Sequence, residues 1–180
     1  MLRRYRDRFP AVDPTAYIDE SAQVIGDVVI GAESSVWMNV VIRGDVNTIR
    51  IGRRTNIQDA TVVHVMRETH PTAIGDEVTI GHGAIVHGCT IGSRVLVGMG
   101  VLILNGATIG EDVILAAGSL ITEGAIVPPR SLVMGRPGVV KRALSDAEVA
   151  SIRWYADNYV GYRLDYMPAA PESQRRPGSR

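Results

Sequence analysis

Isoleucine, valine or leucine recurs every six residues over most of this chain. A period of six matches neither the 3.6-residue turn of an α-helix nor the two-residue alternation of a simple strand, so an amphipathic helix is excluded for this region. More than a dozen residues share the phase, which argues against a β-sandwich with chance spacing. The runs are Ile18, Val24, Ile30, Val36, Ile42; Ile51, Ile57, Val63; Ile74, Ile80, Val86; and Ile91, Val97, Ile103, Ile109, Leu115, Ile121, Val127, Val133, Val139.

A short strand and a tight turn together use about six residues, with the aliphatic side chain inward and glycine or small polar residues in the turn. Three such units close a triangular coil of about eighteen residues, and successive coils stack as parallel strands about 4.8 Å apart. Each coil then covers the aliphatic row of its neighbour, as in other solenoids. We therefore predict an all-β solenoid, a parallel β-helix of hexapeptide repeats.

The six-residue pattern ends after Val139. The segment from Ser145 to Glu148 has the S-x-x-E form of a capping box, and apolar residues then follow at helical spacing. We predict a helix from about Asp146 to Leu164 that packs on the outside of the β-helix. The expected organisation is a β-helix domain over residues 1–140, the helical region over 141–167 and a disordered tail over 168–180, where Pro, Ser and Arg are frequent.

Composition narrows the possible partners. The chain of 180 residues has nineteen basic and nineteen acidic side chains, so neither a nucleic acid nor a membrane is expected as a partner. Its single cysteine, Cys89, allows no internal disulfide, in keeping with a reducing compartment. The arginine-rich N-terminus does not resemble a signal peptide. The longest apolar run, Val95 to Leu104, is shorter than the about 20 residues that a membrane span needs, and we expect a cytoplasmic protein.

The phase of the repeat predicts which histidines lie together. When the longer spacings after Ile42 and Val63 are treated as insertions, these two residues and Val86 form one column on adjacent coils. Arg43, His64 and His87 directly follow the members of that column, so they should stack on one another. His82 follows a different column and should face away from His64 and His87 within one chain.

Three imidazoles together would form a metal site. Catalytic zinc takes three protein ligands and leaves one position for water. A trimer whose three-fold axis runs parallel to the β-helix would bring His64 and His87 of one chain to His82 of its neighbour. The alternative is that each histidine is an ordinary surface or core residue, and spacing alone leaves this open.

Several motifs in order resemble the γ-class carbonic anhydrases and their bacterial relatives over roughly residues 10 to 165. They are Arg43-Gly44-Asp45, Asn56-Ile57-Gln58-Asp59, His64, Gly81-His82-Gly83-Ala84-Ile85-Val86-His87-Gly88-Cys89 and Gly135-Arg136-Pro137. The resemblance implies a left-handed β-helix, a homotrimer and a metal between subunits held by His64, His82 and His87. Zinc is the expected metal, and iron or cobalt also suits imidazole ligands. The implied reaction is reversible hydration of carbon dioxide to bicarbonate, a lyase activity carried out by metal-bound hydroxide.

The resemblance also implies roles for the polar residues. Arg43 and Asp45 correspond to a salt-bridged pair that supports the site and the trimer interface, or that serves structure alone. Gln58 corresponds to a residue that hydrogen-bonds the reacting water or bicarbonate, with Asn56 and Asp59 in support; the alternative for Asp59 is a turn residue alone. Tyr159 corresponds to a tyrosine that reaches the site, although its place in the helical stripe also fits plain packing. Cys89 is expected to be a small buried residue.

The chain departs from the family pattern where a proton shuttle is expected. Val46 stands where the family has a glutamate, and the loop after His64 is short. Glu68 or His70 is a candidate substitute, since an exposed histidine titrates near neutral pH. Two other functions therefore remain open: an acyltransferase or thioesterase that acts on coenzyme A thioesters, and a non-catalytic metal-binding protein.

Overall fold

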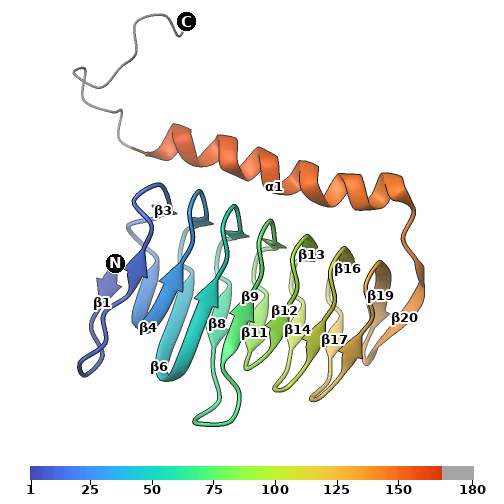
Figure 1. Ribbon diagram of the computed structural model, residues 1–180, viewed down its shortest axis with the longest axis horizontal. Helices are drawn as coiled ribbons and strands as arrows, with labels where there is room; N and C mark the ends of the chain where they lie inside the picture. The colour runs from blue at the N-terminus through green and yellow to red at the C-terminus, as the bar shows by residue number, and fades with distance from the viewer. Residues whose placement is uncertain (168–180) are drawn as a thin grey trace, which may run out of the picture.

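A computed structural model describes residues 1–167 of the chain, and the predicted disordered tail lies outside these residues. The described chain winds into a left-handed parallel β-helix with a single helix, α1, lying along one side of it (Figure 1). Each coil has three short strands and three turns, so the molecule is a triangular prism with three faces. The six-residue repeat thus produces the predicted solenoid.

The first two faces share the long strands β4 (Gln23–Ile30) and β6 (Val41–Ile51), which bend from one face to the next. The first face continues through β8 (Val62–His64), β11 (Ile85–His87), β14 (Leu102–Ile103) and β17 (Leu120–Ile121), and β1 (Leu2–Arg3) joins its other end. The second face consists of β2 (Ala11–Val12), β9 (Thr72–Ile74), β12 (Thr90–Ile91), β15 (Thr108–Ile109) and β18 (Ile126–Val127) beside the long strands.

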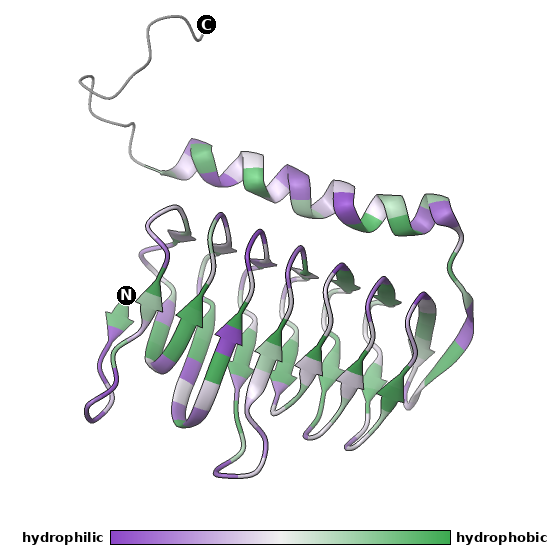
Figure 2. Ribbon diagram, viewed as in Figure 1, coloured by the Kyte–Doolittle hydropathy of each residue, from purple (hydrophilic) through white to green (hydrophobic). Residues whose placement is uncertain are grey.

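The third face is a separate sheet. It contains β3 (Tyr17–Ile18), β5 (Ser35–Val36), β7 (Asn56–Ile57), β10 (Thr79–Ile80), β13 (Val95–Val97), β16 (Val113–Leu115), β19 (Ser131–Gly135) and β20 (Gly138–Ala143). Hydrophobic residues concentrate on the strands and polar residues in the turns (Figure 2). The in-phase side chains from Ile18 to Val133 point into the prism, and the described core contains no Phe.

The predicted columns agree with the strand register. Ile42 pairs with Val63, and Val63 pairs with Val86, so one column continues through consecutive coils. Ile51 pairs with Ile74 on the second face, which shows that the longer spacings are insertions that leave the phase intact. The insertion after β8 forms the loop that extends furthest from the prism (Figure 1).

The prediction that Val139 is the last member of the repeat is wrong. Strands β19 and β20 pair antiparallel, so the chain reverses after Gly135 instead of completing another coil. Val139 therefore lies on a closing hairpin with 48% of its surface exposed. Strand β20 also extends to Ala143 and so crosses the expected domain boundary at residue 140.

The helix α1 spans Asp146–Tyr166, two residues beyond its expected end, and Ser145 and Glu148 form the predicted capping box. Its buried residues Ile152, Ala156 and Arg163 face the prism, with contacts to β5 and β10. Within residues 1–167, no helix has the length and apolar character needed to cross a membrane.

Candidate metal centre

Two histidines meet at the edge of the first face. His64 ends β8 and His87 ends β11, and the two residues are register partners in neighbouring coils. The Nδ1 atom of His64 lies 3.1 Å from the Nε2 atom of His87. The two histidines therefore stack as predicted, and one ring nitrogen of each points toward the other.

The other nitrogen of each ring is held by an oxygen. His64 Nε2 lies 3.0 Å from Asp45 Oδ1, and Arg43 forms an ion pair with the same carboxylate. His87 Nδ1 lies 2.7 Å from Asn105 Oδ1. Burial opposes ionisation of Asp45, but hydrogen bonds from His64 and Arg43 outweigh it and lower the pKa of that carboxyl group. An ionised carboxylate only accepts hydrogen bonds, so His64 must carry its proton on Nε2.

This arrangement fits a cation. With their outer nitrogens protonated, His64 and His87 turn two lone pairs toward each other across 3.1 Å. A metal ion that accepts both lone pairs relieves their repulsion, and imidazole ligands with an oxygen partner on the second nitrogen are the usual pattern in metal sites. Burial lowers the pKa of His64, which favours the neutral form that binds metal.

His82 lies apart from this pair, in the turn between β10 and β11. Its Nδ1 atom is 2.8 Å from Asp59 Oδ2, and its side chain is about half exposed. Among residues 1–167, its Nε2 atom has no hydrogen-bond partner. Asp59, a predicted supporting residue, thus contacts His82. Over residues 1–167, no three His, Cys, Asp or Glu side chains of one chain come together in a way that could hold a metal. One chain thus offers two imidazoles at one corner and a third at another.

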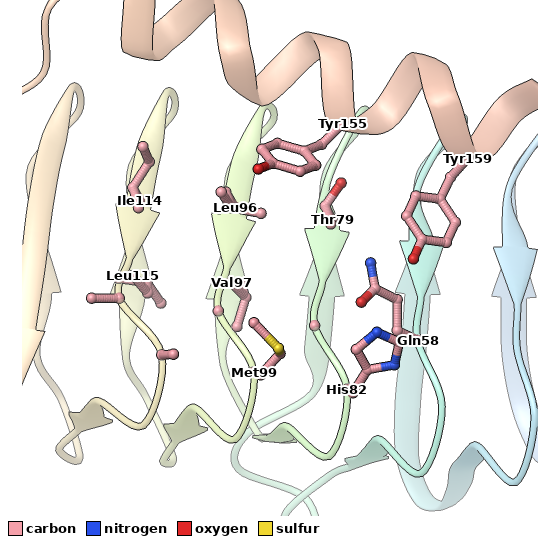
Figure 3. Close-up of a pocket in the computed structure, with 14 residues that line it drawn as sticks. Gln58, Thr79, His82, Leu96, Val97, Met99, Ile114, Leu115, Tyr155 and Tyr159 are labelled. Carbon is pink, nitrogen blue, oxygen red and sulfur yellow. The ribbon is translucent and has the colours of Figure 1, made fainter.

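Gln58 lies beside His82 on the third face, and Tyr159 extends toward them from α1 (Figure 3). Gln58 is buried, and its amide nitrogen donates to Asn56 Oδ1 at 3.1 Å. Asn56 in turn donates to Thr79 Oγ1 at 2.8 Å. The amide of Gln58 is therefore fixed in orientation, and its Oε1 atom remains available as an acceptor.

These residues line a pocket of about 360 Å³ between the third face and α1. Its walls are mainly apolar, and its members are Gln58, Thr79, Gly81, His82, Leu96, Val97, Gly98, Met99, Ile114, Leu115, Ala116, Ala117, Tyr155 and Tyr159. Tyr159 both packs and lines the pocket, because its ring also meets Trp37 edge-on with centroids 5.5 Å apart. Burial raises the pKa of Tyr159, so its phenol is protonated at neutral pH.

Sequence reasoning missed Asn105 and Tyr155. Val86 pairs with Ile103, so Leu104 is the register partner of His87 and Asn105 lies one residue beyond it. Counting coils therefore brings Asn105 near His87 but does not predict their contact. Tyr155 precedes Tyr159 by four residues and therefore shares its face of α1.

As expected, Cys89 is buried, and burial raises the pKa of its thiol to about 12, which leaves it protonated and inert as a nucleophile.

The two candidate shuttle residues line different pockets. Glu68 lines a pocket of about 240 Å³ together with Asp45, Val46 and Arg67. His70 lines a different pocket together with Asn105, and its Nδ1 atom contacts Thr69 Oγ1 at 2.9 Å. Of the two, only Glu68 shares a pocket with Asp45, the residue that holds His64.

Comparison with known proteins places the chain in a family. A model of bacterial transferase hexapeptide repeats matches residues 88–123. The crystal structure of a hexapeptide transferase family protein from Anaplasma phagocytophilum superposes with a TM-score of 0.89 and 43% identity, covering 92% of this chain and 98% of that one. This likeness supports the fold over nearly its whole length.

Two relatives extend the comparison. A "probable carbonic anhydrase" of Methanocaldococcus jannaschii is 60% identical over 143 residues, covering 79% of this chain and 89% of the relative. Protein YrdA of Escherichia coli is 47% identical over 180 residues, covering 97% and 98%. The chain belongs to the γ-carbonic anhydrase-like family of hexapeptide-repeat proteins.

Proposed function

We propose that this protein is a metal-dependent carbonic anhydrase of the γ class, whose site forms between the subunits of a homotrimer. The observation that carries the proposal is the pair of facing imidazole nitrogens of His64 and His87, 3.1 Å apart, each ring held from behind by an oxygen acceptor. His82 presents the Nε2 atom of a third imidazole at another corner of the prism, beside Gln58. A three-fold assembly brings these two half-sites together, since each subunit then presents different faces to its two neighbours.

His64, His82 and His87 would hold a divalent metal, with zinc as the first choice and iron or cobalt also compatible with three imidazoles. When bound, such a metal supplies hydroxide at neutral pH by lowering the pKa of water from about 15.7 to about 7, a value established for carbonic anhydrase itself.

The chain's own residues orient the reactants. Gln58 Oε1 accepts a hydrogen bond from the attacking water, because Asn56 holds the amide nitrogen. The apolar wall near Val97 and Leu115 suits carbon dioxide, which offers no hydrogen-bond donor. The Arg43–Asp45 ion pair keeps His64 in the tautomer that binds metal. Glu68, which shares a pocket with Asp45, is the group we assign to receive the proton that must leave.

One observation favours a second candidate. The pocket beside His82 has a volume of about 360 Å³, within the range of about 300–1,000 Å³ typical of sites for larger molecules and far more than carbon dioxide fills. An apolar acyl group would fit this pocket, with its carbonyl near Gln58. Metal-assisted hydrolysis of a coenzyme A thioester is therefore the alternative activity, and metal binding without catalysis is the third possibility.

A paired assay separates these functions. Protein purified and loaded with zinc or iron under anaerobic conditions is expected to accelerate carbon dioxide hydration in stopped-flow measurements, and Gln58→Leu is expected to lower kcat by about tenfold or more. The same preparations are tested for thiol release from a panel of acyl-coenzyme A thioesters. Thiol release without hydration would assign the second function. Full metal occupancy without either activity would assign a binding role.

A further inference from the structure

A hydrogen-bonded row of side chains runs along one edge of the β-helix through the two histidines. Asn105 lies on the coil after His87, one residue beyond the register partner of His87, and Glu123 lies in register with Asn105 on the coil after that. Asn105 Nδ2 donates to Glu123 Oε1 at 3.1 Å, while its Oδ1 faces His87 Nδ1 at 2.7 Å. The complete row, here called the edge ladder, is Asp45, His64, His87, Asn105 and Glu123.

The backbone keeps Asn105 and Glu123, the last two members of the edge ladder, in register. Gly106 and Gly124 directly follow Asn105 and Glu123, and both adopt a positive φ that permits the same tight turn on each coil. The Gly124 amide donates to the Asn105 carbonyl at 2.9 Å, so the turns themselves are bonded to one another. Asn105 and Glu123 therefore project from equivalent positions, one coil apart.

The two ends of the edge ladder determine the direction of its hydrogen bonds. Asp45 and Glu123 are carboxylates and only accept. Glu123 requires Asn105 to present its NH₂ group, which turns the amide oxygen toward His87. That oxygen requires a proton on His87 Nδ1, so the lone pair of His87 lies on Nε2, facing His64.

We infer that Glu123 is a positioning residue for the metal centre and acts through Asn105, two coils from the histidine pair. The inference rests on the proposed function, because it specifies how the ligands of that site are kept ready for a cation. Without an acceptor-only group at position 123, Asn105 can rotate and offer its NH₂ group to His87. His87 then carries its proton on Nε2 and donates it to His64, a hydrogen bond that a metal must break.

Two variants test whether Glu123 determines the direction of the hydrogen bonds along the edge ladder. In Glu123→Gln the shape is kept, but the new amide can donate as well as accept, so the constraint on Asn105 is lost. The double change Asn105→Asp with Glu123→Gln moves the carboxylate one coil toward His87. Asp at position 105 only accepts, and Gln at position 123 can donate to it, so the original direction is restored. Glu111→Gln is the matched control, because Glu111 is paired with Arg94 away from the edge ladder.

The first readout is the ring-nitrogen NMR spectrum of the metal-free protein labelled with ¹⁵N-histidine. We expect His87 to carry its proton on Nδ1 in wild type, in the control and in the double variant, and to shift toward Nε2 in Glu123→Gln. The second readout is zinc affinity by chelator competition. Removal of a group that orients a metal ligand costs about 10–100-fold, and for the more distant Glu123 we expect about fivefold, restored in the double variant.

An unchanged His87 tautomer in Glu123→Gln would overturn the inference. So would a loss of zinc affinity that the double variant does not recover. Failure of wild type to bind zinc would instead count against the proposed function, while the tautomer of His87 would still decide the role of Glu123.

Discussion

Replacing His82 with alanine is expected to empty the metal site of the assembled protein although His64 and His87 remain in place. Two imidazoles do not make a catalytic zinc site, which takes three protein ligands. Metal content measured by mass spectrometry should therefore fall from about one ion per chain toward zero. Carbon dioxide hydration should fall to the uncatalysed rate, while the circular dichroism spectrum should stay that of wild type, because His82 lies in an exposed turn.

His70→Ala is the matched control, since it removes the only other histidine of the chain. His70 lines a separate pocket together with Asn105, makes no contact with His64 or His87 through its ring nitrogens, and should not affect metal content. Equal metal content in His82→Ala and His70→Ala would contradict the assignment of His82 as a ligand.

Replacing Gly75 with alanine is expected to destabilise the β-helix strongly. Gly75 lies at a corner directly after β9, where a Cβ atom would come within 2.7 Å of Ser93 N and 2.8 Å of Gly92 C. Both are backbone atoms of the next coil, so the coils must separate to admit a methyl group. Overpacking of this kind costs about 1–3 kcal/mol, and we expect the upper part of that range in denaturant unfolding at a fixed protein concentration.

Gly161→Ala provides the comparison for the same chemical change. Gly161 lies within α1 with no atom near the position of a Cβ, and alanine is a better helix former by about 0.8–1.0 kcal/mol. This variant should equal or exceed wild type in stability. If Gly75→Ala were as stable as Gly161→Ala, the result would contradict the close backbone contact between coils at this corner.

The fold was predictable because one rule governs most of the chain. An inward aliphatic residue every six positions determines the three faces, and counting coils then places His64 above His87, as the strand register confirms. The same count put His82 on another column. The insertions did not disturb this reasoning, because Ile51 and Ile74 resume the phase on the second face.

The remaining features depend on interactions that the six-residue period does not encode. Val139 kept the period by coincidence, since the chain had already reversed after Gly135 to form the closing hairpin. The sequence does not determine whether Asp59 contacts Gln58 or His82. The geometry of the turns shows the contact with His82. The pocket next to Gln58 required the docking position of α1, which follows from tertiary packing and not from the helix's own sequence.

The most direct test of the shared metal site mixes two inactive chains. One carries His82→Ala and the other carries His64→Ala and His87→Ala, and the two are unfolded, combined in equal amounts and refolded together. If each site takes His82 from one subunit and His64 and His87 from its neighbour, every mixed trimer regains one intact site. Random assembly should then restore about a quarter of the wild-type metal content and hydration activity. Mixed trimers that form but recover neither metal nor activity would contradict a site built between subunits.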